Sequence, residues 1–371
     1  MTQIMKRLQY LEFPECSIQA LEYLVLTHSS QPGTVIPGFG GHEEEISIEI
    51  SQNYILFQNR KGKLSAVQEL NLLEMLCHSL QTAPEGSRYT IFKVIFGGKP
   101  EECKTLLLTS LVSMALSTSC GAVLDCAALW MQEHDCYSKP VCDLSRTLVE
   151  DYCILFSDVN PAFQRLPSVS PLFTCNLITA VTTIYPFRDK KTIPPASLLE
   201  YLTEWISDDY CLCSESVRLV RIQAHFSCPF PGLVNWCVLG PLVLQCENSN
   251  EISVSENTSI VTLSKLHLSV LQSLQAYRSM ELSQELFLMS TMLVVAQTLL
   301  GHQKQKHPTD KDLIHSAIDR LGQVIQVALE TGSLKVERGR SELRKINKLL
   351  PHNRLLSMVS RKYAAEPMDV S

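Results

Sequence analysis

Two apolar runs between Thr262 and Leu300 constrain the fold more than any other part of this sequence. Residues 282–300 are apolar on nearly every side, so a helix there must be covered on several faces. The earlier run has the spacing of an amphipathic α-helix with one buried face. We therefore predict a helical hairpin whose second arm is buried between neighbouring helices. The stripe of its first arm consists of Leu263, Leu266, Val270, Leu274 and Tyr277, with Leu271 at its edge.

The remaining sequence is also patterned as helices joined by short breaks. Ser65 and Gln68 have the spacing of a capping box at a helix start. Residues 43–58 are ambiguous, because Ile46 and Ile50 fit a helix whereas Ile48 completes a strand-like alternation. We predict a helix, since the acidic residues 43–45 favour a helix N-terminus. Further helices are predicted at residues 15–28, 65–80, 87–96, 101–118, 121–132, 141–156, 170–185, 195–206, 212–224, 231–246, 310–330, 341–349 and 353–361.

No strand-rich block interrupts this series, so the predicted fold class is all-α. Sequential helices with short connections usually pack antiparallel, and a long series without a fixed repeat favours an irregular α-solenoid of stacked HEAT-like or armadillo-like hairpins. The alternative is a compact assembly of several helical bundles.

Glycine, proline and polar residues divide the chain into five expected segments. Residues 31–41 hold four Gly and two Pro, which is typical of a loop, and residues 247–258 are polar and poorly patterned. The segments are an N-terminal helix with a flexible loop (1–41), an N-terminal helical-repeat region (42–246), a flexible loop (247–261), a C-terminal helical region with a basic last segment (262–362) and a disordered tail (363–371).

The charge distribution singles out one candidate interaction surface. The chain has a net charge of -6, yet residues 335–362 contain nine Lys or Arg and two Glu. A basic segment on an acidic chain can bind an acidic partner or phosphates, although a solvated helix face has the same composition. Nothing in this pattern indicates a nucleic-acid binder along the whole chain. The candidate partner-binding residues are Arg338, Arg340, Arg344, Lys345 and Lys348.

The cysteines follow no disulfide or metal framework. Fourteen Cys without framework spacing favour a reducing compartment, the cytosol or the nucleus. Cys211 and Cys213 form the closest pair, and with His225 and Cys228 a metal site is conceivable, but free thiols are favoured. We predict no metal and no cofactor.

Catalytic motifs are absent from the sequence. It has no His-Glu-x-x-His, Gly-x-Ser-x-Gly or Walker motif, so we predict that the chain is not an enzyme. A cysteine-dependent hydrolase remains the alternative, because a Cys and a His need only meet in space. The paired acids Glu150-Asp151 could bind a basic group, whereas Asp208-Asp209 is predicted to end a helix.

No segment has the features of a membrane anchor or a signal peptide. Residues 1–10 lack an apolar core, and residues 286–300 are interrupted by polar side chains and are shorter than the roughly 20 residues that a span needs. We expect a soluble protein. Trp130, Trp205 and Trp236 have aliphatic neighbours and are predicted to pack in the core.

Seven short runs, in order along the chain, resemble the family of Integrator complex subunit 15, a nuclear protein. The match covers most of residues 15–359. The runs are residues 68–74 (QELNLLE), 124–132 (LDCAALWMQ), 148–153 (LVEDYC), 193–206 (IPPASLLEYLTEWI), 233–242 (LVNWCVLGPL), 266–272 (LHLSVLQ) and 350–356 (LPHNRLL).

This resemblance implies a non-catalytic helical scaffold in Integrator, the RNA polymerase II-associated assembly that cleaves nascent small nuclear RNA and attenuates transcription. It also implies a nuclear location and association with Integrator subunits 10, 13 and 14, which form a peripheral module. The sequence departs from the family in two places. Family members have a longer proline-rich tail, and they have a lysine-rich insert where residues 245–258 are here acidic and polar. The alternative is a cytosolic helical adaptor unrelated to RNA.

Overall fold

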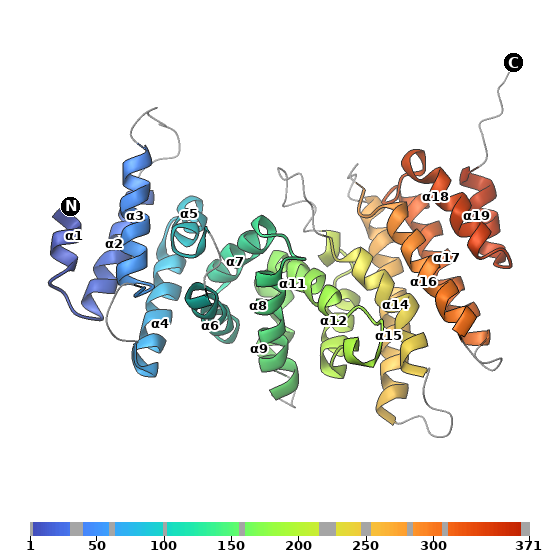
Figure 1. Ribbon diagram of the computed structural model, residues 1–371, viewed down its shortest axis with the longest axis horizontal. Coiled ribbons are helices and arrows are strands. Elements are labelled where there is room, and N and C mark those ends of the chain that lie inside the picture. The colour runs from blue at the N-terminus through green and yellow to red at the C-terminus, as the bar shows by residue number, and fades with distance from the viewer. Residues whose placement is uncertain are drawn as a thin grey trace, which may run out of the picture. The chain divides into compact units, whose positions relative to one another are not determined.

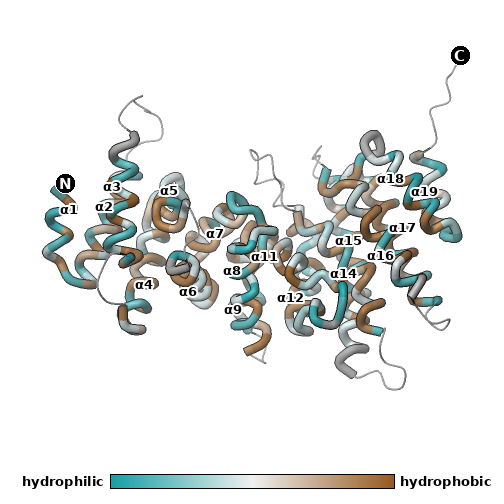
Figure 2. The backbone as a smooth tube through the Cα atoms, in the orientation of Figure 1, coloured by the Kyte–Doolittle hydropathy of each residue, from teal (hydrophilic) through white to brown (hydrophobic). Residues whose placement is uncertain are grey.

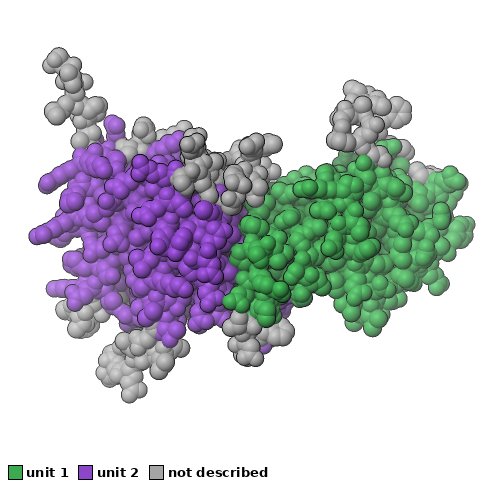
Figure 3. All heavy atoms as spheres, turned by 180° about the vertical axis from the view of Figure 1, so that it is seen from behind, with its two compact units in different colours: residues 1–148, 160–173 green, residues 149–159, 174–371 purple. Residues whose placement is uncertain are grey.

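The computed structural model describes residues 3–29, 40–58, 64–98, 102–155, 160–214, 228–245, 254–279, 285–305 and 311–364 (Figure 1). Within these ranges the regular structure is entirely helical, which confirms the all-α class. The chain forms two compact units, coloured separately in Figure 3. Unit 1 comprises residues 1–148 and 160–173, and unit 2 comprises residues 149–159 and 174–371.

Unit 1 is a layered set of helices in which each helix packs mainly on near neighbours in the sequence. The helices α2, α3 and α4 contact α5 or one another, and α4 and α5 both contact α7. The helices are α1 (Gln3–Leu8), α2 (Glu15–Ser29), α3 (Gly40–Tyr54), α4 (Ala66–Thr82), α5 (Glu85–Phe96), α6 (Glu102–Thr118), α7 (Gly121–Glu133), α8 (Lys139–Val149), α9 (Pro161–Gln164) and α10 (Leu166–Val169).

The predicted capping box is present at the start of α4. Ser65 Oγ accepts the amide of Gln68 at 3.4 Å, and the Gln68 side chain accepts the amide of Ser65 at 2.9 Å. These bonds satisfy two amides that a helix start leaves without a partner. The helical choice for residues 43–58 is also confirmed, as α3, although this helix ends at Tyr54 and residues 55–58 are not helical.

Unit 2 is organised around α17, which contacts α14, α15, α16 and α19. Polar and apolar residues alternate along the tube of most of these helices (Figure 2). The elements are the π-helix η1 (Glu150–Leu155), α11 (Pro171–Ile184), the 3-10 helix η2 (Lys190–Thr192), α12 (Ala196–Asp208), α14 (Phe230–Gln245), α15 (Val254–Ser279), α16 (Met289–Gln305), α17 (Lys311–Thr331), α18 (Val336–Leu349) and α19 (Arg354–Ala364).

Helix α14 has an almost continuously buried surface and contains a proline, Pro241. A Cβ atom on Gly240 would come within 2.7 Å of the Leu263 side chain, so α14 and α15 approach closely at this position. Pro241 removes one helical hydrogen bond. The close packing and the proline both belong to one of the runs that resemble the Integrator subunit family, residues 233–242.

The predicted hairpin is correct in its first arm and wrong at the start of its second. The stripe of α15 is buried, with Leu274 fully inaccessible, but α15 begins at Val254 rather than at Thr262. The second arm, α16, begins at Met289 rather than at residue 282. Before it, the Leu286 amide donates to the Ser333 carbonyl at 2.9 Å, a tertiary bond that replaces a helical one.

The second arm is also not covered on every face. Val294 of α16 is 59% exposed, and Leu288 just before the helix is 53% exposed, whereas Met292 and Leu299 are fully buried. The prediction that this segment is buried on nearly every side, which rested on its apolar composition, is therefore wrong for these exposed residues.

The helix predicted at residues 141–156 changes type partway. It is α-helical to Val149 and becomes the π-helix η1 from Glu150. Ser197 Oγ, at the start of α12, donates to the Cys153 carbonyl at 2.8 Å and so provides a partner for the widened turn. Of the helix predicted at residues 212–224, only its first turn lies within the described residues. In the described ranges no helix is long and apolar enough to cross a membrane.

Candidate interaction surface

The basic segment forms a helical hairpin of α18 and α19, which we call the basic hairpin. In α18, Leu343 and Ile346 are buried while Arg340, Lys345 and Lys348 are exposed or only partly buried. This arrangement follows from helical periodicity, because buried and exposed residues alternate every three or four positions. Helix α18 packs against α16 and α19, while the side chains of Arg340, Lys345 and Lys348 remain exposed.

Arg344 differs from the other candidate residues because it makes an internal contact. Its Nη2 and Nε donate to the Ala364 carbonyl at 2.8 and 3.2 Å. This carbonyl lies at the C-terminus of α19, where helical carbonyls lack partners and a cation is stabilising. The sequence placed Arg344 with the partner-binding residues, and the structure gives it a role in joining α18 to α19. At Arg338 the structure describes only the backbone.

Helix α19 has an exposed stripe of one apolar and two basic side chains that was not predicted from the sequence. Met358 is 63% exposed, and one helical turn away on either side lie the exposed Arg354 and Lys362. Lys362 also lies 3.5 Å from Glu330 of α17 and over the Tyr363 ring. An apolar side chain flanked by cations is typical of a protein interface with an apolar centre and a polar rim. The helical spacing of Arg354, Met358 and Lys362 was the available signal in the sequence.

Asn353 positions this stripe by fixing the start of α19. Its Oδ1 accepts the Leu356 amide at 2.9 Å, and its Nδ2 donates to Asp319 of α17 at 2.6 Å. An asparagine at this position is a favoured N-cap. The run 350–356, one of the seven that resemble the Integrator subunit family, therefore contains a capping residue, Asn353, beside the exposed Arg354 of the stripe.

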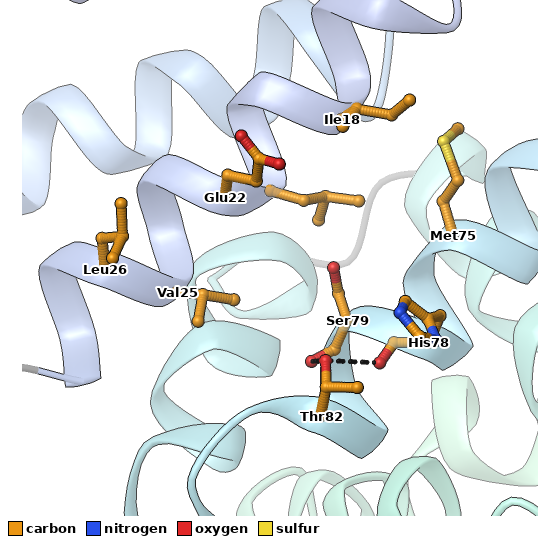
Figure 4. A pocket seen from close by; sticks show the side chains of 9 residues that line it. Ile18, Glu22, Val25, Leu26, Met75, His78, Ser79 and Thr82 are labelled. Carbon is orange, nitrogen blue, oxygen red and sulfur yellow. Dashed lines mark hydrogen bonds between the residues drawn. The ribbon is translucent and has the colours of Figure 1, made fainter.

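A second concave surface lies in unit 1 between α2 and α4 (Figure 4). It has a volume of about 650 Å³ and is mainly apolar, with Glu22, His78 and Thr82 on its walls. Ile18 and Val25 are half-exposed and line this groove, next to Leu26, which is 70% exposed. The groove has the character of a site for an apolar side chain of a partner.

The other candidate groups are explained by the fold. Trp130, Trp205 and Trp236 are all buried, as predicted, and the Trp236 indole donates to the Tyr185 carbonyl at 2.7 Å. Asp208 ends α12 as expected. Glu150 and Asp151 lie on η1.

The cysteines that the sequence suggested as metal ligands differ in how deeply they are buried. Cys211 is half-buried, whereas Cys213 and Cys228 are buried, and burial raises the pKa of both thiols. His225 lies outside the described residues. Within those residues no group of three or more His, Cys, Asp or Glu is arranged to hold a metal ion.

Comparison with known proteins gives one consistent result. The family model described as Integrator complex subunit 15 matches residues 2–352. The chain is 33% identical over 353 residues to Integrator complex subunit 15 of Mus musculus, covering 84% of this chain and 77% of the relative. It is 32% identical over 356 residues to the Danio rerio protein, covering 87% and 73%. With the Homo sapiens protein the identity is 32% over 332 residues, covering 80% and 72%.

Proposed function

The chain belongs to the Integrator complex subunit 15 family, and from this we propose that it is a non-catalytic scaffold subunit of the nuclear Integrator complex. As such it associates with other Integrator subunits. We propose that it joins the peripheral module of subunits 10, 13 and 14 to the complex, and so supports small nuclear RNA 3′-end processing and attenuation of RNA polymerase II transcription. The irregular solenoid arrangement of its helices is part of this proposal.

The observation that carries the proposal is the extent of the family match. It spans residues 2–352 and therefore includes both compact units up to the end of α18. A family match of this extent supports a shared role for the whole helical chain. The run at residues 233–242 is almost entirely buried, whereas the runs at 68–74 and 350–356 also contain exposed residues, among them Leu70 and Arg354. We assign the partner contacts to such exposed faces.

Two exposed surfaces support a scaffold role in particular. The basic hairpin presents Arg340, Lys345 and Lys348 on α18 and the Met358 stripe on α19. We assign this surface to an acidic segment of an Integrator partner, because an exposed methionine among cations fits an acidic chain with apolar side chains. The α2–α4 groove is a second, more apolar contact site.

The cysteine-dependent hydrolase is the less favoured alternative. A nucleophilic Cys needs a base within hydrogen-bonding reach. Cys77, Cys120 and His78 line one small pocket, but in the part of the chain that the structure describes the His78 ring makes no hydrogen bond to either thiol. The other alternative, a cytosolic adaptor, shares the helical scaffold and differs only in location and partners.

The test is purification of the tagged chain from nuclear extract, followed by mass spectrometry. We expect Integrator subunits, with 10, 13 and 14 among the most abundant. Recovery of the intact protein without any Integrator subunit would contradict the proposal. Fractionation of the same cells distinguishes this proposal from the cytosolic adaptor. If the chain were a cytosolic adaptor, it would be absent from the nuclear fraction.

A further inference from the structure

The turn between α6 and α7 places a cysteine at a helix N-terminus. Ser119 adopts a left-handed conformation (φ 54°), and the Cys120 amide donates to the Ala115 carbonyl at 2.8 Å. The Ser119 amide donates to the Leu116 carbonyl at 3.2 Å. These two bonds form a Schellman motif that ends α6. Cys120 then serves as the N-cap residue of α7, a helix of 13 residues.

The surroundings of Cys120 favour its thiolate. The neighbouring Cys77 thiol lowers the pKa of the Cys120 thiol to about 6, while burial opposes this shift. The amides of Val123 and Ala122 in the first turn of α7 lower the pKa further by their proximity, although the Cys120 side chain makes no capping hydrogen bond there. Arg88 adds a positive charge, and its guanidinium is held by bonds to the carbonyls of Gln81 and Ala83 at 3.1 and 2.9 Å. Helix N-termini and nearby cations are the usual means of activating a cysteine.

Other cysteines in the described residues lie in the opposite environment. Burial raises the pKa of Cys126, Cys153 and Cys237 to about 12 each. Cys142, which is half-buried like Cys77, also has a raised pKa because of burial. Cys120 differs from these thiols in its position, because it is the N-cap residue of α7 and lines one pocket together with a second thiol, Cys77.

A small pocket of about 210 Å³ reaches both thiols. Cys77 is half-buried on α4, Cys120 is 5% exposed, and His78 and Met114 line the same opening. The helices α4 and α7 already pack against each other, so a bond between the two sulfurs would join elements that are in contact. As no third ligand is arranged beside them in the described residues, the pair fits a dithiol rather than a metal site.

We propose that Cys77 and Cys120 form a redox-active dithiol that a hydroperoxide oxidises to a disulfide. The Cys120 thiolate attacks the terminal oxygen of the hydroperoxide, the O–O bond breaks, and Cys120 becomes a sulfenic acid as hydroxide or alkoxide leaves. The Cys77 sulfur then attacks the Cys120 sulfur, and its proton leaves with the hydroxyl group as water. The two sulfurs are oxidised by two electrons in total, and the peroxide is reduced by two.

The experiment uses the full chain, hydrogen peroxide and differential alkylation followed by mass spectrometry of the peptides. We expect a cross-linked peptide joining Cys77 to Cys120 that dithiothreitol reverses, with Cys142 still free. In the Cys77→Ser variant, Cys120 should instead accumulate as a sulfenic acid that dimedone traps. In the Cys120→Ser variant, Cys77 should react no faster than Cys142.

A second measurement keeps the proposal falsifiable if a variant folds poorly. In the unaltered chain, iodoacetamide should modify Cys120 about tenfold or more faster than Cys142 at pH 7, with the rate of Cys120 rising through about pH 6. Equal rates for these two cysteines, or peroxide cross-links that do not join Cys77 to Cys120, would overturn the proposal. Either outcome is independent of whether the chain binds Integrator subunits.

Discussion

Arg320 of α17 donates a 2.9 Å hydrogen bond from Nη1 to the backbone carbonyl of Cys237 in α14. This carbonyl has no helical donor four positions later, because that residue is Pro241, which lacks an amide hydrogen. The guanidinium therefore replaces the bond that the proline removes. Its Nη2 donates to Ser264 Oγ of α15 at 2.8 Å, so one side chain joins three helices of unit 2.

Replacing Arg320 tests whether α14 needs this side chain because Pro241 lacks an amide hydrogen. We expect Arg320→Met to lower the free energy of unfolding by about 2 to 3 kcal/mol, because it leaves a buried carbonyl without a partner. In a Pro241→Ala background the amide of the introduced alanine can serve the Cys237 carbonyl, so the same substitution should cost at least about 1 kcal/mol less. Urea unfolding of the four proteins measures the difference. Equal costs in both backgrounds would refute this account of Arg320.

The buried stripe of α15 provides a test with a matched control on the same helix. Leu274 is fully buried and Leu268 is 61% exposed. Leu274→Asp should lower the free energy of unfolding by at least about 3 kcal/mol, because it buries an unpaired charge. Leu268→Asp should change it by less than about 0.5 kcal/mol. Thermal unfolding followed by circular dichroism compares the two, and similar melting temperatures would show that the stripe is not part of the core.

The basic hairpin can be tested by charge reversal. The triple variant Arg340→Glu, Lys345→Glu and Lys348→Glu should recover less of the Integrator subunits on purification, because it reverses the charge that attracts an acidic segment. Its fold should persist, since none of the three is among the apolar side chains that pack α18. Reversal of Lys6 and Arg7, exposed on α1, is the control and should leave recovery unchanged. Unchanged recovery with the triple variant would indicate a solvated face.

Arg344 should behave differently from its neighbours. Arg344→Ala removes both bonds to the Ala364 carbonyl and is expected to lower stability by about 1 kcal/mol. Lys345→Ala, at the next position and exposed, should change stability by less than about 0.5 kcal/mol. Chemical unfolding distinguishes them, and an equal effect of both would contradict the capping role.

The pH dependence of unit 2 should follow His267. Burial lowers the pKa of this histidine in the folded protein below its ordinary value near 6.5; the bond from its ring to Gln323 opposes this shift, and Arg320 adds to it. The unfolded chain then binds a proton that the folded chain does not. Stability is therefore complete above about pH 6.5 and is lost as the pH falls below it, by at most about 1.4 kcal/mol per pH unit.

The measurement is urea unfolding at pH 7.5, 6.5 and 5.5 for the unaltered chain and for His267→Gln. The unaltered chain should lose more stability on acidification than the variant. The pKa of His28 is also lowered by burial, but this group is present in both proteins and cancels in the comparison. Identical pH dependence would contradict the assignment to His267.

The sequence predicted those parts of the fold that depend on interactions between residues close together along the chain. The capping box of Ser65 and Gln68 and the buried stripe around Leu274 are set by spacing along one helix, so the sequence contains the information directly. The family resemblance was readable for a similar reason. Some of its runs contain closely packed, buried residues, such as Gly240 and Pro241. Close packing limits which side chains fit at such positions.

The features that could not be predicted depend on contacts distant in sequence. The start of α16 at Met289 is accompanied by the bond from the Leu286 amide to the Ser333 carbonyl, and the π-helical turn is accompanied by the bond from Ser197 to the Cys153 carbonyl. The dithiol was missed because its partners, on α4 and at the start of α7, are brought together only by helix packing.

The bond between Arg320 and Cys237 spans 83 positions of the chain. On the ribosome, α14 therefore emerges well before the residue that completes its hydrogen bonding. A fragment that ends before Lys311 would leave the Cys237 carbonyl bare and the surface of α14 uncovered. Partner mapping by progressive deletion from the C-terminus would then confuse loss of folding with loss of binding once the cut passes Thr331. Point substitutions on the outer faces of α18 and α19 avoid this confusion.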